Sequence, residues 1–201
     1  MQKDNSTFEH KVALRRVAVK RAGAGALVLE THGGFGRIFE RVYDQLAGVV
    51  IEKDDKKVKH LAQQRPTWRV YQGDCAKALA AGLAADVPFS VIDLDPYGSP
   101  FDVMEAIFSG EPRKLAQRVQ LVVNDGLRNK VKVGGAWHTA RLKPIVARWG
   151  NDLYPVYLDV ARELVREIAG AAGFKLADWG GYYCGANGDM SHYLATLERG
   201  Q

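Results

Sequence analysis

The sequence has few cysteines and no long apolar segment, and both absences exclude whole classes of protein. Cys75 and Cys184 are far apart and form no CxxC pattern, which argues against a disulfide framework or a cysteine-based zinc site. The histidines share no metal-ligand spacing, so no metal site is expected. No apolar run approaches the roughly 18 residues of a membrane-spanning helix, and residues 1–11 lack the apolar core of a signal peptide. We therefore expect a soluble cytoplasmic protein with no membrane partner.

The composition is otherwise that of an ordinary folded domain with a basic balance of charge. Of the 201 residues, 47% are hydrophobic and 25% are charged. These values suit one domain, residues 1–201, in which residues 1–25 form an N-terminal helical extension. The formal net charge of +5 favours a polyanionic partner such as nucleic acid, although many basic proteins bind none.

Strand-like and helix-like segments alternate along the chain. Apolar patterning predicts strands over 26–30, 48–52, 68–71, 89–95 and 119–124, and helices over 7–21, 37–46, 54–64, 76–83, 101–108 and 154–172. Two further strands, 175–178 and 190–198, flank a glycine-rich turn at 185–188 and should be antiparallel. Because alternating units form parallel sheets, we predict an α/β, Rossmann-like fold. Its seven-stranded, mostly parallel sheet carries helices on both faces and ends in a C-terminal antiparallel hairpin.

A glycine-rich loop, Glu30-Thr31-His32-Gly33-Gly34-Phe35-Gly36, joins the first predicted strand to the next helix. Glycines allow tight turns and close approach to a ligand, and a helix N-terminus offers unpaired N–H groups. A dinucleotide-binding loop would need a third glycine where Phe39 stands, and Glu30 would repel a pyrophosphate. The loop therefore favours a positively charged ligand, the alternative being a simple connection between strand and helix.

Acidic residues also end the second and third predicted strands. A carboxylate at Glu52 can accept hydrogen bonds from both hydroxyls of a ribose. Asp74, in the segment Gly73-Asp74-Cys75, could contact a nucleotide base, cap the following helix, or do both. Because parallel strands end at one edge of the sheet, these acids and the glycine loop should lie together.

The glycine loop resembles the acid-x-Gly-x-Gly-x-Gly pattern of class I S-adenosylmethionine-dependent methyltransferases, with His32 in place of the first glycine. A C-terminal hairpin in a parallel sheet is typical of that family. The resemblance implies S-adenosylmethionine as the cofactor, whose ammonium and sulfonium groups suit acidic strand ends. It implies cofactor-binding roles for Glu30, His32, Gly33, Gly34, Gly36, Glu52, Lys53, Asp74, Cys75 and Asp93.

The loop after the fourth predicted strand reads Asp93-Leu94-Asp95-Pro96-Tyr97-Gly98-Ser99-Pro100. Asp95-Pro96-Tyr97 resembles the (Asp/Asn)-Pro-Pro-(Tyr/Phe) motif of methyltransferases that act on exocyclic amines of bases. That resemblance implies catalytic roles: Asp95 and the Pro96 carbonyl accept the amine hydrogens, and Tyr97 stacks on the base. The alternative is a proline-rich turn that starts a helix at Ser99 and Pro100.

The longer string resembles the Asp-x-Asp-Pro-Phe-Gly-Ser-Pro segment of the tRNA guanine-N2 dimethyltransferase family, with looser similarity over residues 25–125. Members of that family have a different glycine loop and a further C-terminal tRNA-binding domain, so the resemblance implies the reaction type more strongly than the substrate. RNA is favoured over DNA, and a partner subunit could supply recognition. The alternatives are methylation of a small-molecule or protein nitrogen, and a non-catalytic cofactor-binding subunit.

A basic stretch, residues 128–148, follows the fifth predicted strand, near the same edge of the sheet. Cations suit phosphates, and interleaved aromatic side chains suit unstacked bases. We therefore predict a nucleic-acid surface, which basic residues of the first helix such as Arg15 and Arg21 could extend. A solvated loop with its tryptophans in the core explains the stretch equally well. The predicted contact residues are Arg128, Lys130, Lys132, Trp137 and Arg141.

Overall fold

Helices and strands alternate along the chain as the apolar pattern predicts. The structure is a computed structural model that describes residues 7–109, 112–132, 140–185 and 187–200. Its elements are α1 (Phe8–Ala22), β1 (Leu27–Glu30), the π-helix η1 (Phe39–Tyr43), β2 (Ala47–Glu52), α2 (Asp55–Gln64), β3 (Arg69–Gln72), α3 (Cys75–Ala80), β4 (Val91–Leu94), α4 (Phe101–Phe108), β5 (Arg118–Asp125), α5 (Leu127–Lys132), α6 (Leu142–Trp149), the 3-10 helix η2 (Gly150–Leu153), α7 (Tyr157–Ala171), β6 (Phe174–Cys184) and β7 (Met190–Arg199).

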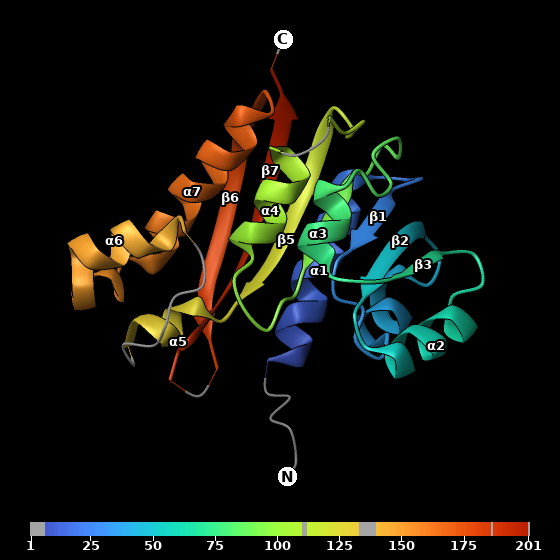
Figure 1. Cartoon of the computed structure of the whole chain (residues 1–201), viewed down its shortest axis with the longest axis horizontal. Helices are drawn as coiled ribbons and strands as arrows, with labels where there is room; N and C mark the ends of the chain where they lie inside the picture. The colour runs from blue at the N-terminus through green and yellow to red at the C-terminus, as the bar shows by residue number, and fades with distance from the viewer. Residues whose placement is uncertain (1–6, 110–111, 133–139, 186, 201) are drawn as a thin grey trace.

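Seven strands form one sheet in the order β3-β2-β1-β4-β5-β7-β6. Neighbouring strands from β3 to β5 are parallel, and β7 is antiparallel to both β5 and β6 (Figure 1). The predicted α/β fold, with its mostly parallel sheet and C-terminal antiparallel hairpin, is confirmed. The strand order reverses direction between β1 and β4, which is where ligands bind in open α/β sheets.

Helices cover both faces of the sheet, because side chains that alternate along each strand are apolar on both sides. In β1, Leu29 belongs to the larger core, which includes Leu79 of α3, Met104 of α4 and Leu164 of α7. The next residue back, Val28, belongs to a smaller core on the opposite face with residues of η1 and α2. Residues two apart on a strand therefore share a face, which decides where the strand-end acids point.

Helix α1 lies against the sheet on the face of the smaller core. It contacts β5, β7, β4 and η1, and its Ala18 packs with Val122 and Leu194. Figure 1 shows the N-terminal end of α1 at the same end of the molecule as the carboxyl end of β5. The residues predicted as an N-terminal extension therefore bring the first turn of α1 to the edge at which the parallel strands end.

The largest differences from the predicted elements are three. The helix predicted over 37–46 narrows to a π-helix at Phe39–Tyr43. The basic stretch contains two helices, α5 and α6, which were not predicted from the apolar pattern of the sequence. Strand β6 runs over Phe174–Cys184, far beyond the predicted 175–178. None of the helices in the described ranges has the length and apolar character needed to cross a bilayer.

Candidate active site

A cavity of about 760 Å³ opens where β1, β2 and β4 end. Its volume falls within the range of small-molecule sites, roughly 300–1,000 Å³. It brings together residues from both predicted loops and from the acidic ends of β2 and β3. The predicted residues that line it are His32, Gly34, Glu52, Lys53, Asp74, Asp95, Pro96 and Tyr97.

Other predicted residues lie behind the cavity, and some lining residues were not predicted. Glu30, Gly33, Gly36, Cys75 and Asp93 are absent from the described lining. Further lining comes from residues that the motifs did not include: Lys11 of α1, Lys57 of α2, Gly126 and Asn129 after β5, and Asp189 and Met190 before and at the start of β7.

The glycines shape the first loop in different ways. Gly34 and Gly36 have φ values of +57° and +72°, a left-handed conformation that favours glycine. A Cβ atom on Gly33 would lie 2.5 Å from Cγ2 of Val50 and 2.7 Å from Cδ1 of Leu61. Gly33 therefore lets the loop pass close to β2 and α2, while Gly34 turns the backbone into the cavity.

The Glu52 carboxylate is fixed by backbone donors. It accepts hydrogen bonds from the N–H groups of Gly34 at 2.9 Å, Lys53 at 2.8 Å and Asp54 at 3.0 Å. Because both oxygens are already oriented, the group presents its remaining lone pairs to the cavity in a set direction. Such a carboxylate is suited to a pair of ribose hydroxyls.

Asp74 caps α3 and also lines the cavity. Its Oδ1 accepts a hydrogen bond of 3.2 Å from the N–H of Lys77, which satisfies one orphan donor of the first helical turn. The helix-cap reading of Asp74 is confirmed, and its position still allows a ligand contact. Cys75, one residue later, is buried and donates its thiol hydrogen to the Thr31 carbonyl. Burial raises the pKa of the Cys75 thiol to about 12, so it is not a nucleophile.

Glu30 does not face the cavity. Its carboxylate forms an ion pair with Arg65, and both side chains are almost wholly buried. The Arg65 guanidinium also lies over the rings of Phe39 and Trp68, 4.4 Å and 5.0 Å from their centroids. The predicted contact between Glu30 and a cationic ligand does not fit this geometry, because a cation of the chain itself already occupies the carboxylate.

Asp93 is likewise held by an internal arginine. Arg15 of α1 donates to its two oxygens at 2.5 Å and 2.7 Å, and the Tyr43 hydroxyl donates at 2.9 Å. The Arg15 and Asp93 side chains are 0% and 2% exposed. Burial alone would lower the pKa of Arg15, but Asp93 more than offsets this and the pKa is raised. The predicted cofactor contact of Asp93 is therefore replaced by a buried ion pair.

Asp95 carries the second ion pair of α1. The Lys11 ammonium lies 2.9 Å from Oδ1 and 2.8 Å from Oδ2, and the two side chains are 19% and 30% exposed. Burial would raise the pKa of Asp95, but Lys11 and Arg15 more than offset that effect, so the pKa lies below its ordinary range. Asp95 is therefore an ionised hydrogen-bond acceptor at the wall of the cavity.

Two ring-bearing side chains, His32 and Tyr97, also line the cavity. Nδ1 of His32 lies 2.8 Å from the Thr31 hydroxyl. Burial lowers the pKa of His32, despite the nearby carboxylates of Asp95 and Glu52, so the imidazole is neutral at physiological pH. Tyr97 is 96% exposed, which is unusual for an aromatic side chain at the mouth of a cavity. Its ring is available for stacking.

The basic stretch is mostly engaged with the protein itself. Arg128 is buried between the rings of Tyr154 and Tyr183, with its guanidinium carbon 3.6 Å from each centroid. Lys132 pairs with Asp189, and Arg141 pairs with Glu105 and Glu167. Lys130 is exposed, and Trp137 lies outside the described residues.

Arg128 is thus unavailable to a phosphate, which corrects the prediction for that residue. Arg15 of α1 is likewise buried, whereas Arg21 forms a surface ion pair with Asp178 at 2.5 Å. Lys53 and Lys57, by contrast, line the cavity and have no carboxylate partner among the described residues. These cavity lysines and the exposed Lys130 are therefore cations that remain available to a ligand.

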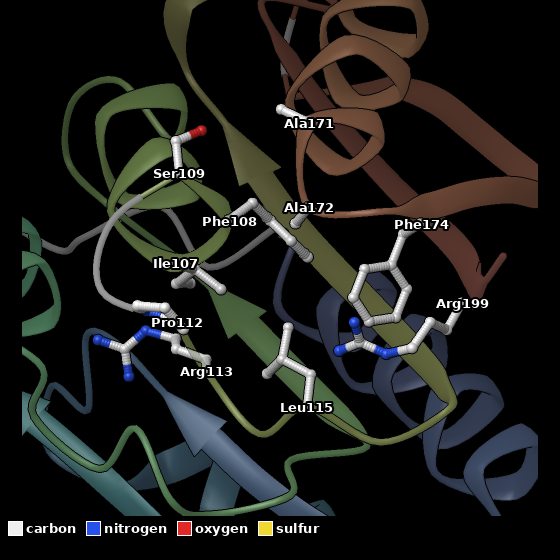
Figure 2. Close-up of a pocket in the computed structure, with 10 residues that line it drawn as sticks. All are labelled: Ile107, Phe108, Ser109, Pro112, Arg113, Leu115, Ala171, Ala172, Phe174 and Arg199. Carbon is white, nitrogen blue, oxygen red and sulfur yellow. The ribbon is translucent and has the colours of Figure 1, made fainter.

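A second cavity, of about 500 Å³, lies at the other end of the sheet, beside the C-terminal ends of α4 and α7 (Figure 2). Its two arginines serve the fold. Arg113 donates to the carbonyls of Leu79 and Leu83, and Arg199 lies 4.5 Å from the centroid of the Phe174 ring. None of the residues predicted from the two loops lines this cavity, whereas eight predicted site residues line the first, which is therefore the candidate active site.

Comparison with known proteins gives matches to structures alone. No family model matches the chain, and no curated protein matches its sequence. TYW2 of M. jannaschii, solved with AdoMet, superposes with a TM-score of 0.60 at 12% identity, covering 99% of this chain and 78% of that chain. The N-methyltransferase NodS of Bradyrhizobium japonicum WM9, solved with S-adenosyl-L-homocysteine, gives 0.64 at 13% identity, covering 100% and 90%.

A third match is the plantazolicin methyltransferase BamL, solved with a triazolic desmethylPZN analog and SAH. It gives a TM-score of 0.57 at 8% identity, covering 96% of this chain and 85% of that chain. These proteins share a strand arrangement with the chain over nearly its whole length, at identities too low to carry a substrate across. The chain has the Rossmann-like fold of the class I S-adenosylmethionine-dependent methyltransferases.

Proposed function

We propose that this protein transfers a methyl group from S-adenosylmethionine to an exocyclic amine of a nucleic-acid base, in RNA in preference to DNA. The observation that carries the proposal is the shared cavity. Asp95-Pro96-Tyr97, which resembles an amine-binding motif, lines it together with Gly34, Glu52 and the cap residue Asp74. Acceptor and donor groups can therefore meet at the point where the strand order reverses.

The residues of the cavity fit the cofactor, with one revision. Glu52 and Asp74 would hold its adenosine half, and Lys53 lies beside Glu52. The described lining has four carboxylates (Glu52, Asp74, Asp95, Asp189) and three lysines (Lys11, Lys53, Lys57). Lys11 pairs with Asp95 and Lys132 pairs with Asp189, so Glu52 and Asp74 are the lining carboxylates without an ion pair among the described residues and can accept hydrogen bonds from the cofactor. Glu30 has no part in this arrangement, since Arg65 neutralises it. When bound, S-adenosylmethionine would supply a methyl group activated by its sulfonium.

The protein's contribution is chiefly to position the acceptor. An aryl amine is a weak nucleophile because its lone pair is delocalised into the ring. The ionised Asp95 carboxylate and the Pro96 carbonyl accept its two hydrogens, which favours a tetrahedral nitrogen. The exposed Tyr97 ring can stack on the base. No strong base is needed before the methyl group arrives, because the nitrogen loses its proton afterwards.

The test is transfer of labelled methyl from S-adenosylmethionine to separate tRNA, rRNA, DNA and protein fractions. We expect label in tRNA or rRNA. Asp95→Ala should abolish transfer, and calorimetry should show that cofactor binding is largely kept. Asp86→Ala, at an exposed turn before β4, is the matched control and should transfer normally. Loss of both transfer and cofactor binding in Asp95→Ala would show that Asp95 is structural and would contradict the proposal.

A second candidate is methylation of a nitrogen in a small molecule or protein. The observation that favours it is the burial of Arg128 against backbone carbonyls and tyrosine rings, together with the ion pairs that Lys132 and Arg141 form with carboxylates of the chain, which reduce the free positive charge of the predicted nucleic-acid surface. Proteins of this fold include NodS, an N-methyltransferase, and BamL, solved with a triazolic compound. Label that enters only protein or small-molecule fractions would favour this candidate. Cofactor binding with no transfer would favour a non-catalytic subunit that depends on a partner.

A further inference from the structure

The group that should receive the target amine is already bound to an amine of the chain. The Lys11 ammonium contacts both oxygens of Asp95 at nearly equal distances, 2.9 Å and 2.8 Å. It therefore sits in front of the carboxylate, where the substrate amine would have to direct the hydrogen that Asp95 accepts. Both Lys11 and Asp95 line the candidate active site.

Lys11 is not itself set up to accept the methyl group. An ammonium bonded to a carboxylate has no lone pair on nitrogen, and the ion pair stabilises that protonated form. Lys11 consequently occupies the position of the target amine on Asp95 but cannot be methylated there. A substrate amine that hydrogen-bonds to Asp95 must first displace the Lys11 ammonium.

The neighbouring ion pair shows which part of this arrangement can move. Arg15, one helical turn after Lys11, binds Asp93 with both side chains 2% exposed or less, and its Nη1 also donates to the Lys11 carbonyl at 3.1 Å. That pair fixes α1 to the end of β4. Lys11 and Asp95 are 19% and 30% exposed, so the ammonium can leave the carboxylate while the helix stays in place.

We propose that Lys11 is a specificity-determining residue that reserves Asp95 for amines carried on a phosphate backbone. This inference rests on the proposed function. A phosphate near the mouth of the cavity can take over the Lys11 ammonium, and Asp95 is then released to the base amine of the same substrate. Lys53 and Lys57 line the same cavity with no carboxylate partner among the described residues, and they add to its attraction for a phosphate. A neutral amine without a phosphate carries no anionic group that could bind the Lys11 ammonium in place of Asp95.

The test compares Lys11→Met with the wild type on two kinds of acceptor. The neutral probes are adenosine, cytidine and guanosine, and the phosphate-bearing probe is total tRNA. Lys11→Met should raise kcat/KM for the reactive nucleoside about ten-fold and lower it for tRNA about ten-fold, mainly through KM. The slope of log KM for tRNA against log salt concentration should fall by about one, as expected for one lost phosphate contact.

Two further variants separate specificity from a structural role. Lys11→Arg keeps a cation and should retain the wild-type preference for tRNA. Lys20→Met removes an exposed lysine from the other end of α1 and should change neither acceptor. The proposal for Lys11 would be overturned if Lys11→Met lost activity equally on both acceptors. It would also be overturned if the ratio of kcat/KM for tRNA to kcat/KM for the nucleoside, and the salt slope, were unchanged; the proposed function would stand in either case. A wild-type protein that labels no acceptor would instead overturn the proposed function, and this inference with it.

Discussion

The cations near the ends of the parallel strands fall into two groups, buried arginines and cavity lysines. Arg15 and Arg65 have fully buried side chains, and each neutralises a carboxylate behind the cavity, Asp93 and Glu30. Lys11 is partly exposed and holds Asp95, which lines the cavity. Arginine suits the first setting because its planar, weakly hydrated fork bonds several atoms at once, and lysine suits the second because its compact ammonium exchanges partners.

This contrast separates acids that hold the fold together from acids that can bind a ligand. All were similar as sequence, namely a carboxylate at or just after the end of an apolar strand. The structure distinguishes them by the cation that each one faces and by the solvent that reaches it. The predictions below test the contrast, from the buried pairs to the exposed lysines.

Removing Arg15 should have the largest effect on stability. Arg15→Met leaves the Asp93 carboxylate buried without its counter-ion, and breaking a buried pair in this way costs about 3–5 kcal/mol. Urea unfolding should show that loss as a lower midpoint. The double variant Arg15→Met/Asp93→Asn should recover much of it, since no buried charge remains. A loss below about 1 kcal/mol in the single variant would contradict the role of this pair.

Removing the Tyr43 hydroxyl should have a smaller effect on the same site. Tyr43→Phe keeps the ring that stacks against Trp68 and deletes the 2.9 Å hydrogen bond to Asp93. Hydrogen bonds to charged groups contribute about 1.5–3 kcal/mol, which thermal unfolding can measure. Tyr182→Phe, which removes a 3.2 Å hydrogen bond to the His10 carbonyl, is the control with the smaller loss. Cofactor binding should be unchanged, and its loss would mean that Asp93 contacts the ligand after all.

Lys11→Met should cost little stability, because the pair that it breaks is partly exposed. We expect a loss of about 1 kcal/mol or less at pH 7. The pKa of Asp95 is lowered in the folded protein, so the stabilisation is present above the ordinary aspartate pKa and is lost as the pH falls through the folded value. Unfolding at a series of pH values should therefore show the two proteins converging in acid. A difference that grows in acid would contradict this sign.

The smallest effect on stability is expected for Lys57→Met, which should change it by less than about 0.5 kcal/mol. Its effect should lie in binding, because Lys57 lines the cavity without a carboxylate partner among the described residues. The slope of log binding constant against log salt concentration for tRNA should become shallower by about one. Lys59→Met, on the same helix but paired with Asp55, is the control. Equal slopes in all three proteins would remove Lys57 from the binding surface.

The fold followed from periodicity, because alternating strands and helices admit few arrangements. The second loop also followed from the sequence, since Asp95, Pro96 and Tyr97 are neighbours along the chain and line the cavity together. Local patterns were sufficient in both cases because the residues concerned act within one element or one loop.

The partners of Glu30 and Asp93 could not be found from local patterns, because Arg65 and Arg15 lie 35 and 78 residues away from them. One signal was nevertheless present. Glu30 is two residues after Val28, and Asp93 two after Val91, and both valines belong to the smaller core. Residues two apart share a face of the sheet, so the two acids had to point towards α1 and the end of α2.

A second missed signal was the match between helix and strand spacing. Lys11 and Arg15 are four residues apart and lie on one face of α1, while Asp93 and Asp95 are two residues apart and share one face of β4 and its extension. The basic stretch failed as a predictor for the opposite reason. Its basic residues were predicted to form a nucleic-acid surface. The Arg128 guanidinium instead packs between two tyrosine rings and donates hydrogen bonds to backbone carbonyls.

The register of β1 on β4 places Glu30 directly beside Asp93. Two adjacent ionised carboxylates in a core repel each other, so Arg65 and Arg15 stabilise this strand pair in the folded protein. One cation follows α2 and the other comes from α1, across a long separation in sequence. Contacts of long separation form slowly, and we expect refolding kinetics to show α1 docking late. The helix synthesised first would then be among the last to reach its native place.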